Sequence, residues 1–186
     1  MKDLESKLLK AKVELMTNSA FISTIALSMQ HIITDKTATA DVNGTVIRYN
    51  PEFLKNQSVS QFAGLIAHEC WHVAFQHLSR RGNRNPIIWN CAGDYIINYM
   101  LTKAGFEIPT GGLLNEKYGD GWSTDQVYDD LIKEEKDFST EGLMLDLRED
   151  EGNKNEKITR DSAVTNIIVR ARTQAQMSGK QAAGEI

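Results

Sequence analysis

The 186-residue sequence has no hydrophobic run long enough to span a bilayer and no excess of positive charge. Lysine and arginine number 21 against 25 aspartates and glutamates, which gives a net charge of −4. Nucleic acid and anionic membranes favour basic protein surfaces, so neither is expected as the main partner. The acidic N-terminus also lacks the apolar core of a signal peptide. We therefore expect a cytoplasmic protein.

Cysteine is scarce, since Cys70 and Cys91 are the only two and both lie in apolar segments expected to be helical. Two reduced thiols are the simplest interpretation for a cytoplasmic protein, so no disulfide is expected. The length predicts a single domain, residues 1–186, large enough to bury a core.

Histidine is also rare, yet two of the four histidines form the motif His68-Glu69-Cys70-Trp71-His72, or H-E-x-x-H. A chance match has odds on the order of one per cent. Residues four apart share one face of a helix, so both imidazoles can reach one metal ion. The Glu between them then lies beside the metal and can take a proton from a bound water.

The motif lies in an apolar stretch that predicts a buried helix. Ser58 and Gln61 form a capping box at its start, apolar residues continue to Leu78, and residues 80–82 provide a stop signal. Burying two His and a Glu without partners is costly, and a metal would supply partners. The alternative is a pair of core histidines beside a solvated Glu.

A catalytic zinc has three protein ligands and one open position, so a third ligand is required. Asn90, Asp94 and Asn98 form a polar stripe with a spacing of four on an otherwise apolar helix. Asp94 is the favoured third ligand, and Asn98 could hold that carboxylate or a His N–H. A stripe facing solvent is one alternative, and Cys91 is the rival ligand, although an isolated Cys is usually a small core residue.

His77 is the other candidate near the motif. On a continuous helix, nine residues from His68 correspond to about half a revolution, so His77 should point away from the metal. No Gly stands between His72 and His77 to break the helix. We expect His77 to support the site or the structure rather than to bind metal.

The remaining pattern predicts a mostly helical α+β fold with a small sheet or hairpin beside the motif helix. Residues 37–42 and 45–49 flank Asn43-Gly44, the signature of a type I′ hairpin. We expect helices over residues 3–16, 19–32, 85–104, 123–133 and 159–178. The charged residues 134–157 suggest a mobile loop or insertion, and residues 179–186 a tail. His31 is expected to be a surface or capping residue.

Several segments together resemble a known family. They are Tyr49-Asn50-Pro51-Glu52-Phe53, Ala67 to His72 with His77, Trp89 to Asp94 with Asn98, and shorter matches to about residue 135. They resemble predicted zinc metallopeptidases of bacteria and phages, which often precede a von Willebrand A-like domain and are encoded near a MoxR-type AAA+ ATPase. The resemblance implies a zincin-like arrangement with His68, His72 and Asp94 as zinc ligands and Glu69 as catalytic base. No von Willebrand A-like domain follows here, so a stand-alone domain or an N-terminal fragment is expected.

The expected function is zinc-dependent hydrolysis of a peptide or protein substrate. The strand over residues 45–49 is a candidate edge for binding peptide by strand addition. An oxyanion donor is also required, and Tyr95, Tyr99, His77 and Arg48 are equal candidates. The rivals are a non-catalytic zinc-binding adaptor that works with a MoxR-type ATPase or a von Willebrand A-like partner, and a zinc hydrolase of non-peptide amides.

Overall fold

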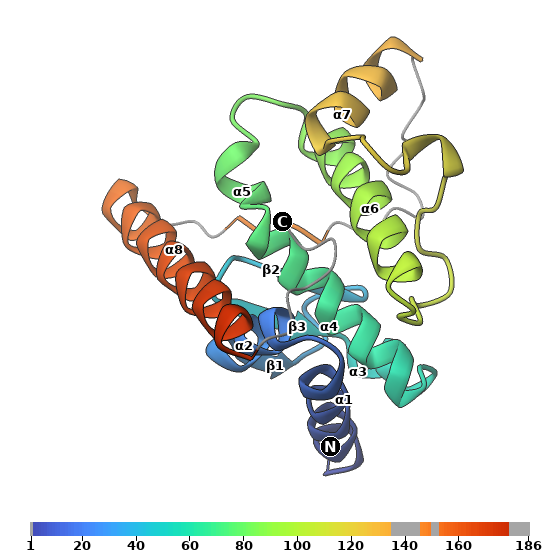
Figure 1. Ribbon diagram of the computed structural model, residues 1–186, viewed down its shortest axis with the longest axis vertical. Coiled ribbons are helices and arrows are strands. Elements are labelled where there is room, and N and C mark those ends of the chain that lie inside the picture. The colour runs from blue at the N-terminus through green and yellow to red at the C-terminus, as the bar shows by residue number, and fades with distance from the viewer. Residues whose placement is uncertain (1, 135–145, 150–152, 179–186) are drawn as a thin grey trace.

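The computed structural model describes residues 2–134, 146–149 and 153–178 (Figure 1). Helices make up most of these residues, and a small sheet lies against them. Within the described ranges no helix is long and apolar enough to cross a membrane. The architecture is the mostly helical α+β fold that the sequence predicts, with the sheet beside the motif helix.

Helix α4 (Val59–Ala74) carries the motif and runs through the middle of the molecule (Figure 1). The predicted capping box is present: Ser58 Oγ accepts the Gln61 N–H at 2.9 Å, and Gln61 Oε1 accepts the Ser58 N–H at 2.8 Å. Every residue from Phe62 to Val73 is buried. The elements packed around it are α1 (Lys2–Asn18), α2 (Ala20–Ser28), α6 (Pro86–Lys103) and β2 (Ala40–Val42).

The motif helix ends earlier than predicted, at Ala74 rather than Leu78. Gln76 has φ of 54° and ψ of 40°, in the left-handed region, and the short helix α5 (His77–Arg80) then begins in a new direction. A left-handed residue cannot continue a right-handed helix. The prediction of one continuous helix is therefore wrong, and the break is made by a glutamine instead of a glycine.

The sheet has three strands in the order β1-β3-β2. β1 (Gln30–Ile33) pairs in parallel with β3 (Val46–Tyr49), and β2 pairs with β3 in antiparallel register. The helix predicted over residues 19–32 accordingly stops at Ser28. Because β3 has a neighbour on both sides, the prediction that residues 45–49 offer a free edge is wrong.

The hairpin between β2 and β3 is confirmed, but its turn is not type I′. That turn needs positive φ at both central residues. Here Gly44 has φ of +100°, whereas Asn43 is not in the positive-φ region. The Asn43 side chain instead closes the turn, because its Oδ1 accepts the N–H groups of Thr45 at 3.1 Å and Val46 at 2.8 Å.

Helix α6 lies between α4 and α7 (Thr124–Lys133) (Figure 1). Asn85 caps its first turn at Pro86, and α7 starts at the predicted capping box of Ser123 and Gln126. The short helices are α3 (Pro51–Lys55) and the 3₁₀ turn η1 (Glu116–Tyr118). Residues of α6, α7 and η1 form a small second core, made of Cys91, Ala92, Ile96, Tyr118, Val127 and Leu131.

Of residues 134–157, expected to be a mobile loop or insertion, the structure describes residues 134, 146–149 and 153–157; the rest lie outside the described residues, as do residues 179–186. Helix α8 (Lys154–Met177) starts before the predicted Thr159, because Asn153 and Glu156 form a capping box. It packs along α2. Residues 146–148 pair with β2 through Val42, which fixes this part of the segment on the sheet.

Candidate metal centre

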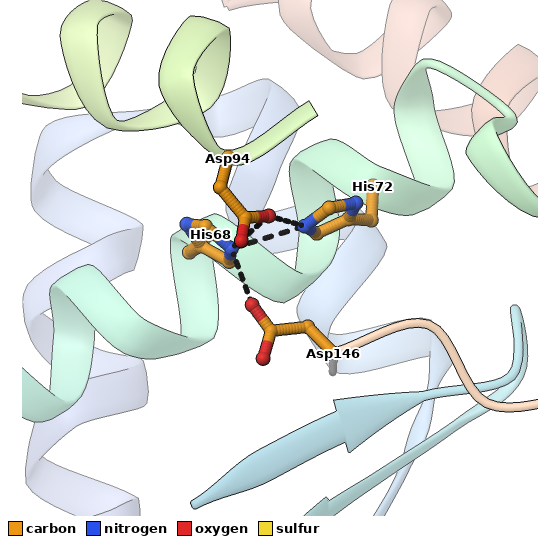
Figure 2. A group of neighbouring side chains, drawn as sticks. All are labelled: His68, His72, Asp94 and Asp146. Atoms are coloured by element: carbon orange, nitrogen blue, oxygen red, sulfur yellow. Dashed lines mark hydrogen bonds and ion pairs between the residues drawn. The ribbon is translucent and has the colours of Figure 1, made fainter. Parts of the chain in front are cut away.

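His68 and His72 lie on one face of α4 and turn the same ring nitrogen toward one point (Figure 2). Their Nε2 atoms are 3.0 Å apart. This convergence follows from the helix alone, because residues at i and i+4 lie one above the other. Both side chains are buried, with 6% and 1% of their surface exposed. Bulk solvent therefore has little access to either ring.

Asp94 approaches the two imidazoles from helix α6 (Figure 2). Its Oδ1 lies 3.1 Å from His72 Nε2 and 3.5 Å from His68 Nε2, and its Oδ2 accepts a hydrogen bond from Asn90 Nδ2 at 2.9 Å. Burial opposes ionisation of this carboxyl, but its contacts with the two histidines outweigh burial and lower its pKa. The polar stripe on α6 thus faces the motif helix instead of solvent.

Asp146 reaches the same point from the opposite side of the histidine pair (Figure 2). Its Oδ2 is 3.0 Å from His68 Nε2, and only 7% of the residue is exposed. The sequence reasoning missed this residue, because it lies in a charged segment expected to be a loop. One signal was available: Leu143-Met144-Leu145 precedes it and Leu147 follows, a short apolar run around a single acid.

The four side chains fit a divalent metal ion. One donor atom from each of His68, His72, Asp94 and Asp146 lies within 4.8 Å of all the others. Four nitrogen or oxygen ligands at about 2.0–2.2 Å in a tetrahedron are separated by about 3.3–3.6 Å. Four of the six donor pairs lie 3.0–3.5 Å apart, close to this spacing, and the other two lie within 4.8 Å. Two buried carboxylates beside two imidazoles also carry negative charge that a cation would offset.

Asn98 orients His68. The Nδ1 of His68 lies 2.8 Å from Asn98 Oδ1, and Asn98 Nδ2 donates to the carbonyl of Leu113 at 3.0 Å. Since the amide nitrogen is committed to that carbonyl, the amide oxygen faces the ring and accepts the Nδ1–H. This fixes the tautomer that leaves Nε2 free to bind a metal, the supporting role that the sequence analysis suggested for Asn98.

His77 orients His72 in a corresponding way. The left-handed Gln76 turns the chain back, so His77 Nδ1 lies 2.9 Å from His72 Nδ1, while His77 Nε2 lies 3.0 Å from Thr124 Oγ1. Both nitrogens of His77 thus have partners, and neither faces the metal point. Burial, followed by the charge of His72, lowers the pKa of His77 well below its ordinary value. A neutral His77 can accept the Nδ1–H of His72.

Gly93 makes this imidazole pair possible. A Cβ at position 93 would lie 2.8 Å from the His77 ring and 3.3 Å from His72 Cε1. These separations are shorter than carbon atoms tolerate without movement. Helix α6 can therefore approach the two rings only because residue 93 has no side chain.

Glu69 is fully buried next to the cluster. Neither of its carboxyl oxygens has a hydrogen-bond partner among the described residues. Burial, and after it the charge of Asp146, raise the pKa of Glu69 well above its ordinary value, while His68 acts in the opposite direction. A buried carboxyl without partners is costly, and a cation with its bound water would reduce that cost.

A cavity of about 50 Å³ reaches the cluster. This is room for a small number of water molecules. Its lining includes Leu65, His68, Asp94, Asn98, Leu113 and Asp146. None of the four suggested oxyanion donors, Tyr95, Tyr99, His77 and Arg48, lines it. Arg48 is instead bound to Asp41, with Nη2 2.6 Å from Oδ2.

The two cysteines stay outside the metal group. Both are free and buried, so no disulfide forms, as expected. Burial raises the pKa of the Cys91 thiol to about 12, and the residue belongs to the second core instead of facing the histidines. Cys91 is therefore a core residue, and the rival assignment as third ligand gains no support.

The sequence was also compared with known proteins. No curated protein and no solved structure matches it. Residues 3–185 match the family described as "Putative metallopeptidase domain". The match takes in both helices that carry the histidines and Asp94, together with the segment that carries Asp146. The chain therefore belongs to this family of metallopeptidase domains.

Proposed function

We propose that the chain hydrolyses peptide bonds with a zinc ion held by His68, His72 and Asp94, and that Glu69 is the general base. Family membership supports a metallopeptidase domain in general. Two imidazoles with carboxylate oxygens are a donor set suited to zinc, and the H-E-x-x-H spacing is that of zinc peptidases. The family match does not specify the mechanism, and the zincin-type mechanism is our own proposal.

Glu69 carries this proposal. A metal site that only stabilises the fold needs its ligands and no further buried carboxyl. Leaving a buried polar group without a partner costs about 1–3 kcal/mol, and more for a charged group. Yet Glu69 follows a ligand directly, is fully buried and has no hydrogen-bond partner among the described residues. A residue kept at such a cost beside a metal site is best explained by chemistry.

The side chains have distinct roles in this reaction. Bound zinc would polarise the scissile carbonyl and lower the pKa of a water. His68 and His72 present Nε2 and keep their protons on Nδ1, held by Asn98 and His77. Glu69 takes a proton from the attacking water and delivers it to the leaving amine nitrogen.

The test is the substitution Glu69→Gln, which keeps the shape of the side chain but removes the base. We expect one zinc per chain in wild type and variant, and at least about a 100-fold loss of cleavage of a peptide library in the variant. Glu52→Gln, at an exposed position of helix α3, is the matched control and should behave as wild type. Robust cleavage that persists undiminished in Glu69→Gln would refute the mechanism.

A second candidate is a non-catalytic adaptor that uses zinc for stability and serves a MoxR-type ATPase or a von Willebrand A-like partner. The observation in its favour is the fourth donor, the carboxylate of Asp146, because structural zinc sites are closed by four protein ligands. Under this alternative Glu69→Gln would change nothing measurable, whereas His72→Ala would still destabilise the fold.

A further inference from the structure

Residues 146–149, here called the strap, extend the sheet at its β2 edge. The Val42 N–H donates to the carbonyl of Asp146 at 2.7 Å, and the Arg148 N–H donates to the carbonyl of Val42 at 2.9 Å. Leu147 and Val42 thus form a parallel bridge. β2 is also the strand that packs against the motif helix. The edge nearest to the histidines is therefore occupied by the chain itself.

Side chains hold the strap from both sides. Asn90 Oδ1 accepts the N–H groups of Asp146 and Leu147, each at 3.2 Å. Arg148 Nε donates to Asp41 Oδ1 at 2.8 Å, and Asp41 lies on β2. The last residue of the strap, Glu149, forms an ion pair with Arg81, which follows α5. These partners lie outside the metal group. The strap is therefore held by several contacts besides the one between Asp146 and His68.

The strap blocks two things that peptide hydrolysis needs. One is a free strand edge, which binds an extended peptide through its backbone. The other is an open metal position, and Asp146 Oδ2 lies 3.0 Å from His68 Nε2 in the donor group. Asp146 also lines the cavity that reaches His68 and Asp94, so the strap forms part of the wall of the access to the metal group. One segment closes both positions at once.

We propose that the strap is an internal inhibitor: it lies along β2 in the place of an extended peptide substrate, and Asp146 binds the metal at the position meant for water. Its displacement as a unit frees the β2 edge at Val42 and the fourth metal position together. The description of the strap as a substrate mimic rests on the proposed peptidase function, whereas closure of the metal position does not.

The test uses the full chain loaded with Co²⁺, whose visible absorption reports the ligands, and acetohydroxamate as a small probe that binds metals through two oxygens. Asp146→Ala removes the blocking ligand. Arg148→Pro keeps the aspartate at position 146. It removes the N–H that binds the Val42 carbonyl and the side chain that binds Asp41, so it should detach the strap from β2. Asp129→Ala, an exposed acid on α7, is the control of equal charge change.

We expect both strap variants to bind acetohydroxamate at least ten times more tightly than wild type, and Asp129→Ala to match wild type. Equal affinity of wild type and Asp146→Ala would overturn the proposal. A gain in Asp146→Ala without any gain in Arg148→Pro would also overturn it, since the strap would not act as a unit. If Asp146→Ala should fail to fold, Arg148→Pro against wild type decides the matter alone.

The same variants separate this inference from the proposed function. Peptide cleavage by Asp146→Ala that disappears in Asp146→Ala/Glu69→Gln would support both. Tight binding of acetohydroxamate by Asp146→Ala without any peptide cleavage would support the claim that Asp146 closes the metal position. It would count against the peptidase function, and therefore against the strap as a substrate mimic.

Discussion

The Nδ1 atoms of His72 and His77 lie 2.9 Å apart, so these two rings share one hydrogen between two nitrogens. If His72 binds a metal through Nε2, the hydrogen belongs to its own Nδ1, and His77 must accept it. A histidine is an unusual partner here, because metal-bound imidazoles more often donate to a carboxylate or a carbonyl. The contact between the two rings depends on Gly93, which has no side chain to collide with them, and on Thr124, whose Oγ1 lies 3.0 Å from His77 Nε2.

We predict that His77→Phe weakens zinc binding without removing a ligand. The ring shape is kept, but His72 loses the acceptor that fixes its tautomer, and losses of this kind are about 10–100-fold in metal affinity. A competition titration with a zinc chelator measures the change. His31→Phe, on strand β1 away from the metal group, is the control. Unchanged affinity in His77→Phe would mean that His72 needs no such support.

Gly93→Ala should destabilise the protein and weaken zinc binding together. Alanine gains about 1 kcal/mol over glycine in a helix interior, but overpacking a buried site costs about 1–3 kcal/mol. The new Cβ would meet the rings of His77 and His72, which are buried and cannot swing away. Urea unfolding and the same chelator titration give both quantities. A more stable variant with full zinc affinity would contradict the close packing described here.

Removal of the metal should lower the melting temperature. Zinc present at about 100 times its dissociation constant stabilises the folded state by about 2.7 kcal/mol, which corresponds to roughly 5–10 °C for a domain of this size. Thermal unfolding with and without EDTA measures the difference, and Zn²⁺ but not Ca²⁺ should restore it, because the site contains two imidazoles. His72→Ala should melt at the lower temperature in both conditions.

The stability of the protein should fall between about pH 6.5 and pH 4 in part because of His31. Its Nε2 lies 2.7 Å from the Ala26 carbonyl and its Nδ1 2.8 Å from the Tyr49 hydroxyl. Burial lowers its pKa to about 4, against 6.5 in the unfolded chain. The unfolded state therefore binds more protons in this range, so the stability that neutral His31 provides above pH 6.5 is lost as the pH falls.

Replacement of His31 by glutamine tests this assignment. Between about pH 7 and pH 5 the linkage amounts to about 2 kcal/mol, so His31→Gln should lose about that much less stability than wild type over the same interval. Urea unfolding at pH 7 and pH 5 gives the free energy of unfolding of wild type and variant at each pH. An unchanged pH dependence in the variant would assign the effect to other groups.

Some parts of the site follow from the sequence because they depend on one helix only. The i, i+4 spacing sets His68 and His72 on the same face wherever the helix lies. Asn90, Asp94 and Asn98 follow the same rule on α6, and an acid within an apolar helix predicts a cation or a polar partner. The capping boxes at Ser58 and Ser123 are equally local, since each is completed within four residues.

Other parts depend on contacts between distant segments, which no local pattern contains. The pairing of β1 with β3 removed the edge expected at residues 45–49, and the left-handed Gln76 aimed His77 at His72. Asp146 lies 52 residues beyond Asp94 in a segment whose charge favours solvent, and only its pairing with Val42 brings it to the metal group. Local spacing thus determined that His68 and His72 converge and made Asp94 a candidate ligand, whereas the packing of α6 on α4 and the pairing of Leu147 with Val42 decided that Asp94 and Asp146 meet them.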